Sequence, residues 1–130
     1  MPPVDSRRPR PRVLIVDDSD EHRRLYALML ADSMSVSTAA DGEQAFAAAK
    51  NILPDVILLD VMMPILDGWQ VCALLKSEPA TASIPIVMLT SLDAEDVPAR
   101  AQQAGALAVL MKPCPLERLT LTIESAVRSV

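Results

Sequence analysis

This chain of 130 residues is poor in aromatic residues, histidine and cysteine. With one Trp, one Tyr and one Phe, its core must be built from Leu, Val, Ile, Met and Ala. The single histidine, His22, excludes a metal site made of several histidines. The two cysteines, Cys72 and Cys114, lie far apart without a CxxC motif. This pattern favours free thiols in a reducing cytosol, although the sequence alone leaves a disulfide open.

Long apolar runs and the common nucleotide-binding motifs are also missing. No run approaches the length of a membrane span, and the N-terminus has no signal-peptide core, so we expect a cytoplasmic protein without membrane contact. Neither GxGxxG nor GxxxxGK[ST] occurs, which leaves dinucleotide and P-loop sites unsupported. From Val13 onward there are eight basic and sixteen acidic side chains, which argues against nucleic-acid binding by the folded domain.

The length suits one domain preceded by a short tail. Residues 1–11 are rich in Pro and Arg and have almost nothing to bury, which predicts a disordered tail before a folded domain at 12–130. The arginines of this tail could contact nucleic acid or a membrane, or they could simply be solvated. Met1 and the tail favour a natural start of the chain.

Five apolar runs alternate with five helical patterns. We expect strands at 12–16, 35–39, 55–60, 85–89 and 106–111, and helices at 20–31, 42–50, 68–77, 94–105 after a cap at Asp93, and 115–130. Such alternation predicts an α/β domain with a parallel sheet, right-handed crossovers and helices on both faces. The strand at 55–60 has four successive apolar residues, which is typical of a strand buried on both faces.

Residue spacing predicts further details of the helices. Pro98 lies inside the fourth helical pattern, so this helix should be kinked or should begin late, near Val97. The expected inward faces of the first and third helices are Leu25, Leu28 and Met29, and Val71, Leu74 and Leu75.

Four of the five predicted strands end in a residue that can take part in chemistry. These residues are Asp17 with Asp18, Asp60, Thr90 and Lys112. Because parallel strands end at the same edge of a sheet, we expect these side chains to converge. Clustered carboxylates repel one another, and a set of oxygen ligands without His or Cys suits Mg²⁺. Hydroxyl and ammonium groups beside them could hold a transferring phosphoryl group, with one carboxylate as the nucleophile. Taken alone, Asp60 could instead merely end its strand.

The motifs at these strand ends follow one another in a characteristic order: Val16-Asp17-Asp18, Asp60 with Met62-Met63-Pro64 and Asp67-Gly68, the run 85–90, and Lys112-Pro113. Together they resemble the receiver domain of bacterial two-component response regulators, the CheY-like family. The resemblance covers about residues 12–130. It implies a flavodoxin-like (βα)5 three-layer sandwich, whose five-stranded parallel sheet has the order 2-1-3-4-5.

The resemblance also implies a chemical role for each site residue. Asp60 would accept a phosphoryl group from a phosphohistidine on a sensor histidine kinase or a histidine phosphotransfer protein. Asp17, Asp18, Asp60 and the backbone carbonyl of Met62 would hold Mg²⁺, for which Mn²⁺ could substitute. Thr90 would bind the phosphoryl oxygens and move inward.

Three further implications concern switching and output. Lys112 would pair with the phosphoryl group, and its bond to Pro113 would be cis. Thr90, Val109 and Pro113 would form the switch region. The protein would be a phosphorylation-controlled switch that acts on no external substrate, phosphorylates and dephosphorylates itself at Asp60, and signals to an unknown downstream protein. It would be a monomer or a weak phosphorylation-dependent dimer, either stand-alone or one receiver of a longer protein.

Four positions depart from the family pattern. Val109 stands where Tyr or Phe is usual, and Cys114 follows Lys112-Pro113 where Phe is often found. Our hypothesis is that output depends on backbone shifts around Thr90 and the helix that Pro98 interrupts. Met62 and Leu92 are apolar where polar residues often position the hydrolytic water, which predicts slow self-dephosphorylation.

Two other functions stay open at this stage. A pseudo-receiver would bind partners without phosphorylation. A small Mg²⁺-dependent phosphatase or phosphotransferase would use an aspartate nucleophile, but Asp60-Val61-Met62 lacks the second acid two residues on that a haloacid-dehalogenase-like phosphatase has, and there is no cap domain.

Overall fold

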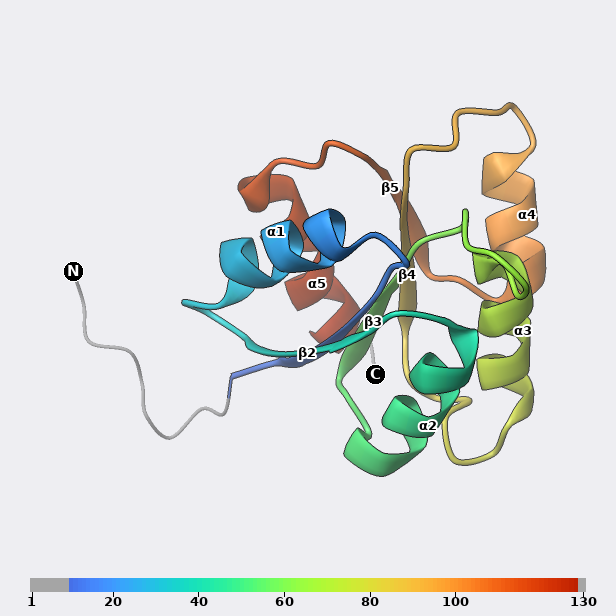
Figure 1. Cartoon of the computed structure of the whole chain (residues 1–130), viewed down its shortest axis with the longest axis horizontal. Helices are drawn as coiled ribbons and strands as arrows, with labels where there is room; N and C mark the ends of the chain where they lie inside the picture. The colour runs from blue at the N-terminus through green and yellow to red at the C-terminus, as the bar shows by residue number, and fades with distance from the viewer. Residues whose placement is uncertain (1–9, 129–130) are drawn as a thin grey trace.

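The computed structural model describes residues 10–128 (Figure 1). Its strands are β1 (Arg12–Val16), β2 (Ser35–Ala39), β3 (Val56–Leu59), β4 (Ile86–Thr90) and β5 (Ala108–Met111). Its helices are α1 (Asp20–Leu30), α2 (Gly42–Ile52), α3 (Gly68–Ser77), α4 (Val97–Ala104) and α5 (Leu116–Arg128). All strand pairs are parallel, and the order is β2-β1-β3-β4-β5. The predicted flavodoxin-like three-layer sandwich is confirmed.

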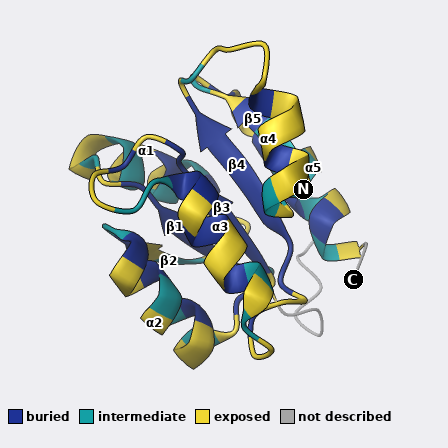
Figure 2. Ribbon diagram, turned by 90° about the vertical axis from the view of Figure 1, so that its right-hand side faces the viewer, coloured by how far each residue is buried: buried dark blue, intermediate teal, exposed yellow. Residues whose placement is uncertain are grey.

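The sheet separates two hydrophobic core clusters. Along β1, Leu14 and Val16 belong to the cluster under α2, α3 and α4, while Val13 and Ile15 belong to the cluster under α1 and α5. Figure 1 shows α1 and α5 on one side of the sheet and the other three helices on the opposite side. In Figure 2, β3 and β4 are buried along their length between helices whose outer faces are exposed. The continuous apolar runs of these strands are therefore explained by burial on both faces.

Side-chain caps fix where the first three helices begin. Ser19 accepts a hydrogen bond from the backbone N–H of His22, and Asp41 accepts one from Gln44. Asp67 and Gln70 form a reciprocal capping box at the start of α3. Helix α4 begins at Val97 with proline in its first turn, as the position of Pro98 predicted.

The predicted inward faces of α1 and α3 were wrong in part. Leu25, Leu28 and Leu74 are 49%, 70% and 46% exposed. On α1 the buried residues are Tyr26 and Leu30, spaced four residues apart. The Tyr26 hydroxyl accepts a hydrogen bond from the N–H of Cys114 at 3.3 Å, which helps to turn this stripe inward in place of the leucine stripe beside it.

Some predictions concern the ends of the chain, the cysteines and the membrane. Residues 1–9, which hold most of the predicted tail, lie outside the described residues, so the division at residue 12 stays a prediction. Cys72 and Cys114 are both buried and free, as expected. Within residues 10–128, no helix is long and apolar enough to cross a membrane.

Candidate functional site

The polar residues that follow the strands meet at the carboxyl edge of the sheet. The pairing of Val16 with Leu59 sets Asp17 and Asp60 side by side, and the N–H of Asp60 donates to the Val16 carbonyl at 2.9 Å. At the other side, Lys112 donates its N–H to the carbonyl of Thr90 at 2.8 Å. Strand register therefore brings these residues together, as their positions in the sequence predicted.

Three carboxylates form the centre of this edge. One oxygen each of Asp17, Asp18 and Asp60 lies within 4.8 Å of the other two. Asp17 and Asp60 are buried, whereas Asp18 is exposed. Carboxylate oxygens with one side open to water are the donor set that Mg²⁺ accepts, since this ion keeps several of its waters. The residues present fit such a cation.

The ammonium group of Lys112 lies against the two buried acids. Its Nζ forms an ion pair with Asp17 and lies 3.6 Å from a carboxylate oxygen of Asp60. The Lys112 side chain is only 7% exposed, so water screens these contacts weakly. The ammonium group of Lys112 thus offsets part of the negative charge of the three carboxylates.

Burial raises the pKa of Asp60 above its usual value. Lys112 opposes this shift, the charge of Asp17 adds to it, and the Met62 N–H and the Thr90 hydroxyl oppose it to a smaller extent. The net direction is upward, so keeping Asp60 ionised in the folded protein costs free energy. An added positive charge at this edge would lower that cost.

The family of the chain follows from a comparison with known sequences. The response regulator receiver domain family matches residues 13–124. This chain belongs to that family. It is accordingly a CheY-like receiver domain of two-component signalling.

Three known proteins illustrate the similarity. Response regulator PleD of Caulobacter vibrioides is 43% identical over 118 residues, which make up 90% of this chain and 26% of PleD. Protein PilG of Pseudomonas aeruginosa is 38% identical over 119 residues, covering 91% of this chain and 88% of PilG. The solved structure of chemotaxis protein CheY4 from Vibrio cholerae has a TM-score of 0.85 at 33% identity, covering 90% of this chain and 98% of that one. The receiver domain thus spans about a quarter of the length of PleD.

The remaining predicted site residues surround the acids of the receiver domain. Thr90 is fully buried, and its hydroxyl accepts a hydrogen bond from the N–H of Leu92 at 3.1 Å. The side chain of Met62 is exposed, while its N–H lies 3.4 Å from an oxygen of Asp60. Val109 is partly buried against the core cluster under α4, and the bond between Lys112 and Pro113 is cis.

Two contacts at this edge were missed by sequence reasoning. Nδ1 of His22 lies 2.8 Å from Nζ of Lys112 and 3.7 Å from Asp17. The cap at Ser19 could have signalled this, because it sets His22 in the first turn of α1. The second contact joins α3 to α4, where the guanidinium of Arg100 lies 5.2 Å from the ring centre of Trp69.

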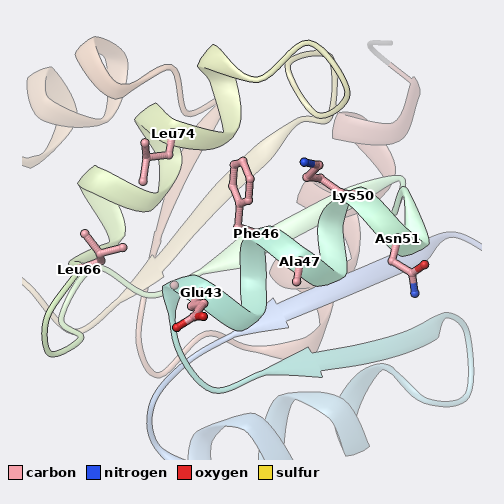
Figure 3. A pocket seen from close by; sticks show the side chains of 8 residues that line it. Glu43, Phe46, Ala47, Lys50, Asn51, Leu66 and Leu74 are labelled. Carbon is pink, nitrogen blue, oxygen red and sulfur yellow. The ribbon is translucent and has the colours of Figure 1, made fainter.

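Two surface hollows differ in their relation to the site. A hollow of about 450 Å³ lies beside the acids and is lined by Met62, Leu92, Trp69 and Arg100, among others. A larger hollow of about 880 Å³ lies between α2 and α3 and contains none of the site residues (Figure 3). Only the smaller hollow belongs to the candidate site.

Proposed function

We propose that this receiver domain is a phosphorylation-controlled switch that accepts a phosphoryl group on Asp60. The observation that carries the proposal is the position of Asp60 beside two further carboxylates and a buried lysine at the carboxyl edge of the sheet. The donor would be a phosphohistidine of a sensor histidine kinase or a histidine phosphotransfer protein. The domain would act on no external substrate.

In the proposed reaction, an oxygen of the Asp60 carboxylate attacks phosphorus in line with the bond to the donor nitrogen. The new O–P bond forms as the N–P bond breaks, and the imidazole leaves with the electron pair and takes up a proton. Lys112 and the Thr90 hydroxyl hold the phosphoryl oxygens and stabilise their charge. Asp17, Asp18, Asp60 and the Met62 carbonyl would hold Mg²⁺, or Mn²⁺ in its place. The bound cation would supply positive charge to the phosphoryl oxygens.

Intact mass after incubation with acetyl phosphate and Mg²⁺ tests this proposal. The wild type should gain the mass of one phosphoryl group, and Asp60→Asn should gain none because the amide is no nucleophile. Asp55→Asn is the matched control, since Asp55 precedes the same strand at its opposite end and should leave the gain intact. No gain in the wild type would contradict the proposal and favour a pseudo-receiver. Hydrolysis of external phosphoesters by the wild type, lost in Asp60→Asn, would favour a phosphatase.

The phosphorylated domain should lose its phosphoryl group slowly. Met62 and Leu92 flank the smaller hollow beside Asp60, and neither side chain can orient a water for attack. Met62→Asn adds such a group, and we expect it to shorten the half-life by about tenfold or more. The decay of the phosphorylated mass measures this, with Met111→Asn, at an exposed methionine of β5, as the control. A wild-type half-life of only seconds would contradict the prediction.

We further propose that the signal leaves the site through Thr90, Pro113 and α4, without an aromatic side chain at position 109. Val109 packs on the core cluster that contains Val97 and Ala101 of α4. Beryllofluoride, which mimics a phosphoryl group, should therefore shift the backbone amide resonances across residues 90–112. NMR of the labelled protein measures these shifts. Unchanged resonances in this range, with changes at Asp60 itself, would contradict this route.

The partners and the location follow from the same proposal. Downstream, the domain would contact a further protein, and its acidic body would make no direct contact with nucleic acid. The expected location is the cytoplasm, where histidine kinases present their phosphohistidine. The expected state is a monomer or a weak dimer that phosphorylation strengthens.

A further inference from the structure

Helix α2 presents an exposed stripe with apolar residues in the middle and opposite charges at its ends. The stripe consists of Glu43, Phe46, Ala47 and Lys50, which follow the helical spacing i, i+3, i+4 and i+7. Glu43, Ala47 and Lys50 are exposed and Phe46 is partly buried. Figure 3 shows Phe46 projecting from the helix, with Glu43 and Lys50 at opposite ends of the stripe.

The stripe forms one wall of the large hollow between α2 and α3. Leu66 and Leu74 form the other wall, and Leu74 is 46% exposed. The two walls are close because α2 begins with Gly42, where an added Cβ would lie 2.8 Å from Val71 and 3.3 Å from Leu66. The hollow of about 880 Å³ thus offers an apolar surface that water covers in the free protein.

The charges of the stripe are complementary to those of a second, antiparallel copy. Glu43 and Lys50 are two helical turns apart, about 10.5 Å along the axis. A two-fold axis beside Phe46 and Ala47 would set each Glu43 against Lys50 of the other copy and pack the apolar residues together. A second copy has the complementary charge order by symmetry.

We propose that the α2 stripe, with the adjoining groove, is the contact of a homodimer. Lys50 already lies over the ring of Phe46, with its Nζ 5.2 Å from the ring centre, so its charge is held at the end of the apolar patch. Within residues 10–128, Glu43 forms no ion pair. Its charge is therefore available to Lys50 of the second copy. The contact lies outside the phosphorylation site and does not depend on the proposed function.

One stripe and its groove make a small interface. Small interfaces with exposed ion pairs are weak, so we expect a dissociation constant of roughly 10 µM to 1 mM. Sedimentation velocity of the full chain across this range of concentration should show a reversible monomer–dimer equilibrium. A single monomeric species up to about 1 mM would overturn the proposal.

Charge reversal tests whether the contact is the predicted two-fold one. Glu43→Lys and Lys50→Glu each replace two attractions by two repulsions, which should weaken the dimer by about tenfold or more. A mixture of the two single variants should form heterodimers, since Glu43→Lys has two lysines on its stripe and Lys50→Glu has two glutamates. Lack of association in the mixture, or dimers of either variant as tight as wild type, would overturn the proposal.

A matched control separates this contact from general effects of charge. Glu21→Lys reverses an exposed acid at the second position of α1, just as Glu43→Lys does at the second position of α2. It should leave the dimer unchanged. If it weakened the dimer as much as Glu43→Lys, net charge and not the α2 stripe would control association, and the proposal would fail. Equal melting temperatures of the two variants would show that both are folded.

Discussion

Lys112→Met should destabilise the receiver domain by about 3 kcal/mol at neutral pH, because removing one partner of a buried ion pair leaves an uncompensated charge. Lys112 contacts both buried acids, Asp17 and Asp60, and is itself almost fully buried. Addition of Mg²⁺ should restore more stability to this variant than to the wild type, since the cation no longer competes with an ammonium group. Urea unfolding with and without Mg²⁺ measures both effects.

The loss caused by Lys112→Met should depend on pH. The pKa of Asp60 is raised in the folded protein from the usual 3.8. Protonation of Asp60 therefore adds fully to the stability of the folded protein below the unfolded pKa, and this contribution is lost as the pH rises through the folded pKa. Lys112 is the main group that opposes the rise in the pKa of Asp60. Without Lys112 this pKa is higher, so the stability of the folded protein falls over a wider range of pH. The variant should therefore approach wild-type stability below about pH 4. Arg24→Met, which removes an exposed basic residue of α1, is the control for net charge. A loss independent of pH would show that packing and not charge is responsible.

The architecture could be predicted because each strand is marked by its own residues. The apolar run of β3 and the half-polar pattern of β2 correspond to a central and an edge strand, and the sheet has them there. The helix faces were harder to predict. Leu25 and Leu28 form as good an apolar stripe as Tyr26 and Leu30, and the choice between them depends on what α1 packs against on its side of the sheet. The sequence of α1 does not contain that information, because it depends on tertiary contacts.

The main residues of the candidate site could also be predicted from the pattern of strands. Its acids and lysine follow apolar strands and its threonine ends one, so topology alone brings them together. The contact of His22 with Lys112 and that of Arg100 with Trp69 come from helices, whose rotation about their axes the sequence does not determine. The residues that follow strands were therefore found, and those that reach the same edge from helices were missed.

Gly68→Ala should destabilise the domain by about 3 kcal/mol, at the upper end for overpacking, because the added atom meets backbone. A Cβ at Gly68 would lie 2.2 Å from the carbonyl oxygen of Asp60 and 2.7 Å from the Cα of Val61. The start of α3 thus rests directly on the main chain of the proposed phosphoacceptor. The N–H of Gly68 also donates to the carbonyl of Val61 at 2.8 Å. Relief of the clash must move either α3 or Asp60, so phosphorylation by acetyl phosphate should be slower too.

Gly42→Ala provides a matched control for this effect. Gly42 is likewise the first residue of a helix and follows a capping aspartate, Asp41. An added Cβ there would meet side-chain atoms and no backbone, at 2.8 Å from a methyl group of Val71 and 3.3 Å from Leu66. We therefore expect Gly42→Ala to cost about 1 kcal/mol, less than Gly68→Ala, and to leave the phosphorylation rate unchanged. Urea unfolding and the rate of phosphoryl mass gain measure the two effects. Equal losses in both variants would mean that the first turn of any helix here excludes a methyl group. The contact between the start of α3 and the main chain of Asp60 would then have no particular effect on the site.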